Sequence, residues 1–159
     1  RDGRDPRGLE PRVGWIHAAA HTADLLKFLA RDPRFARADQ ARLLDASWAK
    51  VTATGTPVFT HAEDERLAAA ILSVVRRPDF DAAALDPWLE RFVALEKRVW
   101  TKTPPDPATL DASQNARDLL RSLHVLLSLP VPSGAGAPGA GEAAAREKVL
   151  ATVAAIRRS

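Results

Sequence analysis

The stretch "LDPWLERFVALEKRVW", residues 85–100, has the apolar spacing of an amphipathic helix. Its large apolar side chains recur every three or four residues, so on a helix they form one buried stripe. Asp86 suits the N-cap position and Pro87 the first helical position, which places the start of the helix here. The residues of the stripe are Trp88, Phe92, Leu95 and Val99.

Five further segments predict helices by the same spacing. Thr60 and Glu63 form the S/T-x-x-E pattern of a capping box, and Asp111 and Gln114 resemble another helix start. No segment has the alternating pattern of a strand. The expected helices cover about residues 13–30, 38–51, 60–77, 111–129 and 142–158.

The predicted fold class is therefore all-α, with about six helices. The first, third and fifth helices begin roughly 45–50 residues apart, which is close to the period of HEAT-type helix pairs. We expect antiparallel pairs in a HEAT-like array or a fragment of an α-α superhelix. A compact bundle is the second choice.

The chain is predicted to form one helical domain over residues 1–159. Residues 1–12 should be an extended lead-in, and residues 131–141, rich in glycine, alanine and proline, a flexible linker before the last helix. The chain contains no methionine. Because a helix pair buries its face only against neighbouring pairs, we also expect the native chain to have further pairs upstream.

Composition removes several classes of function. The absence of cysteine excludes disulfides, thiol nucleophiles and cysteine-ligated zinc, and leaves cytoplasm and periplasm equally open. No apolar run is long enough to cross a bilayer, so no membrane partner is expected. The 23 basic and 20 acidic residues are interspersed, which makes nucleic-acid binding unlikely on sequence grounds.

The stretch "GWIHAAAHTADLLKF", residues 14–28, contains the first candidate site. On a helix, His17, His21 and Asp24 fall on one stripe at the border of the buried face. Two histidines four residues apart and a carboxylate can bind a divalent metal. The zinc-protease pattern H-E-x-x-H is absent, because Ala18 stands in place of the glutamate. The alternative to metal binding, which we favour, is that these histidines form hydrogen bonds with loops or acids at the edge of the core.

The stretch "HAEDERL", residues 61–67, contains the second candidate site. Acids at a helix start are stabilised by the helix dipole, which explains them without any function. In an array of helix pairs, however, the first and third helices are neighbours. This arrangement would place His61 or Asp64 opposite the first stripe. Arg66 could instead pair with Asp24 or another acid across the interface between the helices.

The remaining polar and aromatic residues suggest structural roles. Asn115, Arg117 and Arg121 are only loosely aligned, so we expect a solvated face there rather than a polar ridge. The four tryptophans are expected to anchor the packing of the helices. They are Trp15, Trp48, Trp88 and Trp100.

The two candidate stretches together resemble a bacterial family known only as a domain of unknown function. Its members have the pattern G-W-x-H-x-x-A-H-x-A-D, which here begins at Gly14, and about forty residues later the pattern E-D-E-R-L, which here begins at Glu63. The resemblance covers about residues 4–72. It implies an all-helical, HEAT-like fold and no particular activity.

These observations lead to three hypotheses about function. The first is a module that binds a partner protein or a small molecule in a polar groove whose candidate residues include Trp15. The second is a metal-dependent hydrolase with His17, His21 and Asp24 as ligands and Asp64 as fourth ligand or base. The third and weakest is nucleic-acid binding through the arginines.

Overall fold

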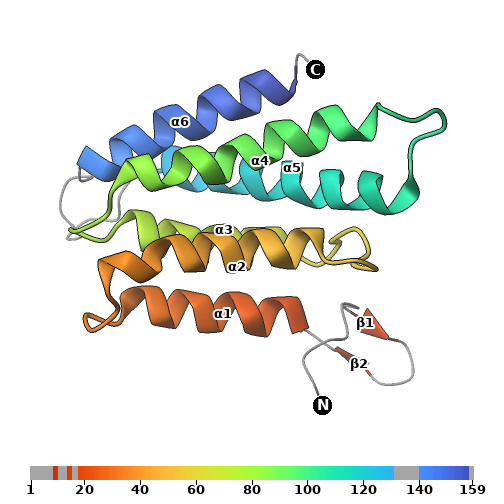
Figure 1. The fold of residues 1–159 in the computed structure, drawn as a ribbon. Coiled ribbons are helices and arrows are strands. Elements are labelled where there is room, and N and C mark those ends of the chain that lie inside the picture. Colours follow the sequence, from red (N-terminus) through yellow and green to blue (C-terminus); the bar gives the residue numbers. More distant parts are fainter. Residues whose placement is uncertain (1–8, 11–13, 16–17, 131–139, 158–159) are drawn as a thin grey trace.

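The computed structural model describes residues 9–10, 14–15, 18–130 and 140–157, with side chains from residue 21 onward. Within these residues the chain forms six α-helices, which confirms the all-α prediction (Figure 1). Two short 3-10 turns, Arg37–Asp39 and Ala82–Ala84, precede α2 and α4. The helices are α1 (Ala18–Arg31), α2 (Gln40–Thr52), α3 (Glu63–Val75), α4 (Leu85–Val99), α5 (Pro107–Ser128) and α6 (Ala140–Ile156).

The six helices form two layers of three. Helices α1, α3 and α5 lie side by side in one layer, and α2, α4 and α6 lie in the other. Successive helices run in opposite directions, so helices of one layer are parallel (Figure 1). This is the predicted array of antiparallel pairs. No helix among the residues described is long and apolar enough to cross a membrane.

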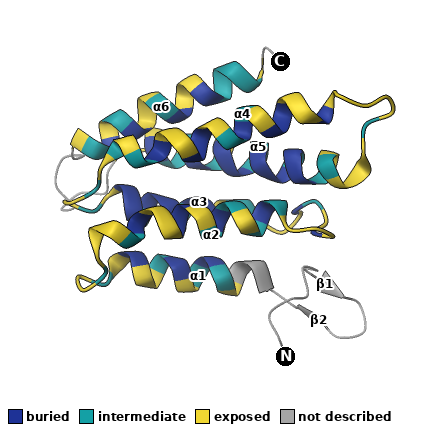
Figure 2. Ribbon diagram, in the orientation of Figure 1, coloured by how far each residue is buried: buried dark blue, intermediate teal, exposed yellow. Residues whose placement is uncertain are grey.

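The hydrophobic core lies between the two layers, as the buried colouring in Figure 2 shows. The predicted stripe of α4 is buried along its whole length. The ring of Phe92 has edge contacts with Trp88 and Trp48, at centroid distances of 4.6 and 4.9 Å. The Trp88 indole Nε1 also donates a hydrogen bond of 2.9 Å to the carbonyl of Leu44 on α2. The centre of α4 is therefore held against α2, its neighbour in the same layer.

Helix α1 begins later than the sequence suggested. Gly14–Trp15 forms a short strand, β2, which pairs antiparallel with β1, Leu9–Glu10. The first helix therefore starts at Ala18 rather than near Val13. The rest of the predicted lead-in and most of the predicted linker lie outside the described residues. Helix α6 begins at Ala140, two residues before its predicted start at position 142.

Three predicted helix caps are wrong. Helix α5 begins at Pro107, because the carboxylate of Asp106 accepts a hydrogen bond of 2.9 Å from the Thr109 N–H. Helix α4 follows directly from a 3-10 turn, and Asp86 in its first turn pairs with Lys148 of α6 instead of capping. The carboxylate of Glu63 accepts from the N–H of His61 rather than from Thr60. Caps depend on how the chain approaches a helix, and helical periodicity carries no information about that approach.

Helix α1 leaves apolar side chains uncovered at the end of the stack. Leu25, Phe28 and Leu29 are exposed, and they recur at helical spacing along one side of α1. A terminal helix of a repeat array has such a face, which a neighbouring pair would cover. The presence of upstream helix pairs in the native chain stays a prediction.

Candidate functional site

Asp24 of α1 lies between two cations at the contact of α1 with α3. Lys27 Nζ is 3.2 Å from Asp24 Oδ1, and Arg66 Nη1 of α3 is 3.4 Å from Asp24 Oδ2. Of the acids that the sequence left open as partners of Arg66, the structure has Asp24. Both side chains are partly exposed, so the pair adds little to stability. With Lys27, the pair places one acidic and two basic side chains side by side on the surface where α1 meets α3.

Asp64 forms a hydrogen bond with α5, on the side of α3 away from α1. Ser122 Oγ donates a hydrogen bond of 2.6 Å to Asp64 Oδ2. The Asp24–Arg66 and Asp64–Ser122 contacts together form a polar row across the N-terminal half of α1, the start of α3 and the middle of α5. We call these four residues the polar row.

The two described histidines of the candidate sites lie on the surface. His21 is exposed on α1, and His61 is exposed just before α3. The ring Nδ1 of His61 is within hydrogen-bond distance, 2.9 Å, of the Thr60 hydroxyl. His17 and the side chain of Trp15 lie outside the described residues.

Metal binding by the first stripe stays a prediction. In the described part of the chain, no three histidines and carboxylates come together as a metal site would need. The predicted set includes His17, which is outside that part. Asp24 is already shared by two cations, and these would compete with a metal ion for its oxygens.

If the stripe does bind a metal, the purified chain should hold about one divalent ion, because three protein ligands and a water molecule make a typical catalytic site. The ion should be lost from the His17→Ala/His21→Ala double variant. Elemental analysis after incubation with zinc, manganese or iron measures this directly. A chain that retains none of these ions would contradict the metal hypothesis and the hydrolase built on it.

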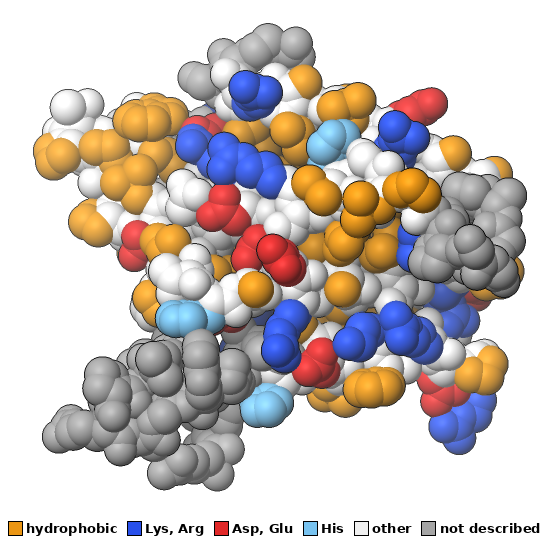
Figure 3. Space-filling model, turned by 180° about the vertical axis from the view of Figure 1, so that it is seen from behind, with side chains coloured by type: hydrophobic (Ala, Val, Ile, Leu, Met, Phe, Trp, Pro, Cys, Tyr) orange, Lys and Arg blue, Asp and Glu red, His pale blue; other side chains and the backbone are white. Residues whose placement is uncertain are grey.

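An open groove crosses the same three helices at their C-terminal ends. Its volume is about 630 Å³, and we call it the face groove. Its floor is apolar, formed by Ala30 of α1, Ala69 and Leu72 of α3, and Leu126 of α5. The face groove and the polar row occupy one surface, the α1–α3–α5 face. Figure 3 shows this surface, with basic, acidic and apolar side chains interspersed over it.

Arg77 at the edge of the face groove has a structural role. Its Nη1 donates to the carbonyls of Ala30 and Asp32 at 2.7 and 3.0 Å, and its Nη2 donates to that of Phe35 at 2.8 Å. These carbonyls belong to the end of α1 and the turn that follows it. Its guanidinium is therefore committed to holding this turn against α3, and it is not free to bind a ligand.

The two other arginines of the face groove differ in their partners. Arg76 Nε donates a hydrogen bond of 3.0 Å to the buried carboxylate of Glu142 on α6. Arg31 Nε donates one of 3.3 Å to the Ser73 hydroxyl. Among the residues that the structure describes, no acid pairs with Arg31. The groove therefore has one cation whose charge is not compensated.

The expectation of a solvated face on α5 is wrong for two of its three residues. Asn115 is fully buried and bonded to the loop before α3. Arg117 pairs with Glu96, a buried acid of α4. The expectation that every tryptophan anchors the core also fails, because Trp100 is 58% exposed. Spacing alone did not reveal these roles, since each depends on contacts between different helices.

Sequence reasoning missed the face groove entirely. Ala69, Leu72 and Leu126 follow ordinary helical spacing, so nothing marks them as a surface feature. The only local signal was the Arg76–Arg77 pair before Pro78, which also fits an ordinary helix end.

Comparison with known proteins identifies a family without a known activity. No curated protein and no solved structure matches the chain. A family described as "Protein of unknown function (DUF2785)" matches residues 1–125. The match includes both candidate stretches and ends within α5. It covers more than half of the chain, and it agrees with the resemblance seen in the sequence. The chain therefore belongs to this DUF2785 family.

Proposed function

We propose that the chain is a protein-binding helical-repeat module. Its α1–α3–α5 face would bind an acidic, partly apolar segment of a partner protein. The observation that carries the proposal is the open face groove, with an apolar floor and one uncompensated arginine at its edge. Arrays of helix pairs bind partners along such layers of parallel helices.

Three further apolar side chains are exposed close in sequence to lining residues of the groove. Val125 precedes Leu126 on α5, Leu129 follows the last residue of that helix, and both are exposed. Leu29 of α1, beside Ala30, is also exposed. Exposed apolar side chains that join the floor of such a groove would enlarge a protein-interaction site. A partner segment with a few apolar side chains would bury it.

The charge at the groove favours an acidic partner. Its lining contains three arginines and one acid, Asp79. Arg77 is neutralised by Asp79, at 3.0 Å, and Arg76 by Glu142. Arg31 remains as the cation that an acidic side chain of a partner would meet. Charge complementarity of this type sets specificity and the association rate more than it sets affinity.

The polar row lies on the same three helices and would form the rim of the interface. Interfaces commonly have an apolar centre surrounded by polar residues that remain accessible to water. Asp24, Arg66 and Asp64 satisfy this description, because each is at least partly exposed and already has a partner. Such residues would fix the register of a bound segment and add little affinity.

A synthetic acidic amphipathic peptide tests the proposal. It would have about 16 residues, roughly 24 Å as a helix, with Leu and Phe at helical spacing and Glu elsewhere. We expect saturable binding in fluorescence anisotropy, weakened about tenfold or more by Arg31→Glu. Arg42→Glu is the matched control, because Arg42 is exposed on α2, in the other layer, and the charge change is identical.

Two outcomes would overturn the proposal. Equal weakening by Arg31→Glu and Arg42→Glu would mean that the peptide senses only the overall charge of the chain. Equal binding of a peptide with Lys in place of every Glu would mean that the groove does not select acids. In either case the α1–α3–α5 face would not be the site of an acidic partner.

A further inference from the structure

A second cavity, of about 270 Å³, lies between the C-terminal parts of α4 and α6 and the middle of α5. It shares no lining residue with the face groove. We call it the α4–α6 pocket. Leu120, Val153 and Ile156 form an apolar wall. Its volume is slightly below the range for small-molecule sites, which is about 300–1,000 Å³, so only a small ligand would fit.

Trp100 forms the aromatic wall of the pocket. It follows the last residue of α4, and its indole is exposed rather than packed in the core. The indole Nε1 donates a hydrogen bond of 3.3 Å to Glu96 Oε1, which orients the ring. An oriented, exposed indole beside an apolar wall is well suited to stack on a flat ring of a ligand.

The charge of the acid at the base of the pocket, Glu96, is already offset by an arginine. The carboxylate of Glu96 accepts hydrogen bonds from Arg117 and from Ser113 Oγ, the latter at 2.8 Å. Burial by itself would raise the pKa of Glu96, but the hydrogen bonds from Arg117, Ser113 and Trp100 outweigh it and lower the pKa. Glu96 is therefore ionised at neutral pH. The positive charge of Arg117 offsets the negative charge of Glu96, so Glu96 would repel a ligand anion little.

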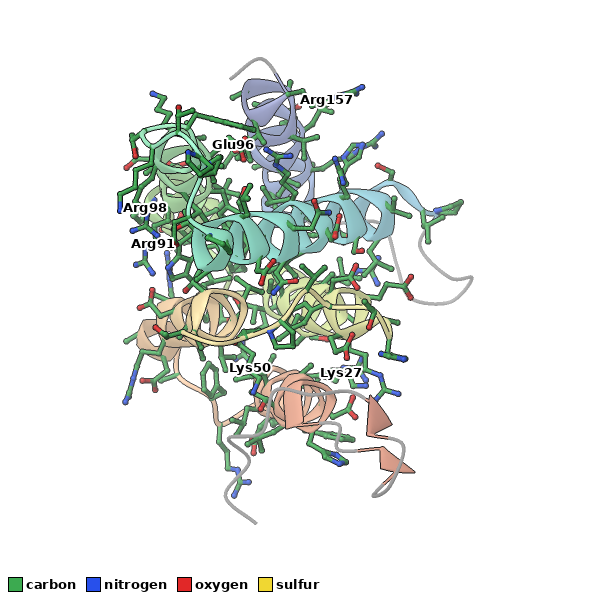
Figure 4. All side chains as sticks on the ribbon, turned by 90° about the vertical axis from the view of Figure 1, so that its right-hand side faces the viewer. Lys27, Lys50, Arg91, Glu96, Arg98 and Arg157 are labelled. Carbon is green, nitrogen blue, oxygen red and sulfur yellow. The ribbon has the colours of Figure 1, made fainter. Side chains whose placement is uncertain are left out.

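Two further arginines make the mouth of the pocket positive. Arg121 of α5 pairs with Asp118 on the surface, at 3.0 Å. Arg157 extends from the end of α6 (Figure 4), and no acid in the described part of the chain pairs with it. With Glu96 and Arg117 cancelling, and Asp118 offsetting Arg121, one positive charge remains. A guanidinium matches the geometry of a carboxylate.

We propose that the α4–α6 pocket binds a small organic monoanion, with a flat apolar ring as its body and a carboxylate as its head group. The ring would lie against Trp100 and the apolar wall. The carboxylate would meet Arg157 and Arg121 at the mouth. This binding is independent of the partner segment proposed for the α1–α3–α5 face, because the two sites have no residue in common.

Titration of the chain with 2-naphthoate, followed by the NMR signal of the Trp100 indole N–H, tests the inference. A Trp100→Phe variant assigns that signal among the four tryptophans. We expect a saturable shift with a Kd of about 1 mM or tighter. The neutral analogue 2-naphthalenemethanol should bind at least about tenfold more weakly, because it lacks the anionic group.

Two double variants of equal net charge test whether the arginines at the mouth of the pocket, rather than the overall charge of the chain, bind the naphthoate. Arg121→Gln/Arg157→Gln should weaken naphthoate binding about tenfold or more. Arg91→Gln/Arg98→Gln should leave it unchanged. Figure 4 shows Glu96 and Arg98 on opposite sides of α4, so the control removes two charges away from the pocket.

Three results would overturn the inference. The first is the absence of a saturable shift of the Trp100 signal up to about 20 mM naphthoate. The second is equal binding of the neutral alcohol. The third is equal weakening of naphthoate binding by the two double variants, which would mean that binding depends only on the overall charge of the chain.

Discussion

Replacing Arg117 by methionine is expected to lower the free energy of unfolding by about 3 kcal/mol at pH 7. The carboxylate of Glu96 is only 3% exposed and has Arg117 as its ionic partner. Methionine keeps most of the apolar stem of the arginine but removes the charge. A buried, ionised carboxylate would remain without compensation, which costs much more than the loss of a surface pair. Urea unfolding followed by circular dichroism measures the difference.

The pH dependence of this effect follows from the lowered pKa of Glu96. In the wild type, the resulting stability is fully present above the pKa of the unfolded state, about 4.3, and is lost as the pH falls through the lower folded-state pKa. In Arg117→Met, burial without the arginine should raise the pKa of Glu96 instead. The stability deficit of the variant should therefore shrink as the pH falls from 7 toward 4.

Two further variants distinguish this explanation from a general effect of mutation. Glu96→Gln in the Arg117→Met background removes the buried charge and should recover a large part of the lost stability. Arg121→Met, one turn further along α5, removes an exposed pair and should cost less than about 0.5 kcal/mol. Equal losses for Arg117→Met and Arg121→Met, or no recovery with Glu96→Gln, would contradict the assigned role of Glu96.

Replacing Asn115 by alanine is expected to cost about 3 kcal/mol of stability. Its Oδ1 accepts a hydrogen bond of 2.7 Å from the N–H of Phe59, and its Nδ2 donates one of 3.0 Å to the carbonyl of Pro57. Asn115 is 0% exposed, so alanine would leave the N–H of Phe59 and the carbonyl of Pro57 without their hydrogen-bond partner. It would also leave a cavity. The higher helix propensity of alanine offsets only a small part of this loss of stability.

The neighbouring residue is the control for this prediction. Gln114 Nε2 donates to Asp118 Oδ2 at 2.7 Å within α5, and its side chain is only half-buried. Gln114→Ala should therefore change the free energy of unfolding by less than about 0.5 kcal/mol. If urea unfolding gives similar losses for Gln114→Ala and Asn115→Ala, Asn115 does not hold the loop as described.

The apolar periodicity of the sequence was sufficient to predict the helices and their pairing. Each predicted stripe needs only local spacing, and the period of the helix starts predicted that α1 and α3 are neighbours. That neighbourhood in turn allowed Arg66 to pair with Asp24 or another acid, and the structure has the pair with Asp24. The bounds were less predictable. An Asp-Pro pair is typical of a helix start, but the pair at 86–87 lies inside the first turn of α4, whereas the pair at 106–107 caps α5.

The polar residues with the strongest structural roles could not be identified from the sequence. Asn115 and Arg117 depend on partners in other elements, more than fifty residues away for Asn115 and twenty-one for Arg117. The face groove and the α4–α6 pocket are shapes formed between helices. No single segment contains them, and their apolar residues follow the same spacing as the core.

The most direct test of the proposed partner binding is a hydrogen–deuterium exchange footprint of the chain with the acidic peptide at saturation. The proposal predicts slower exchange in the C-terminal halves of α1 and α3 and around Leu126 of α5, where the face groove lies. Exchange in α2 and α4 should be unchanged, since they form the other layer. Protection confined to α2, α4 or α6, or spread evenly over both layers, would contradict the assignment of the α1–α3–α5 face as the binding surface.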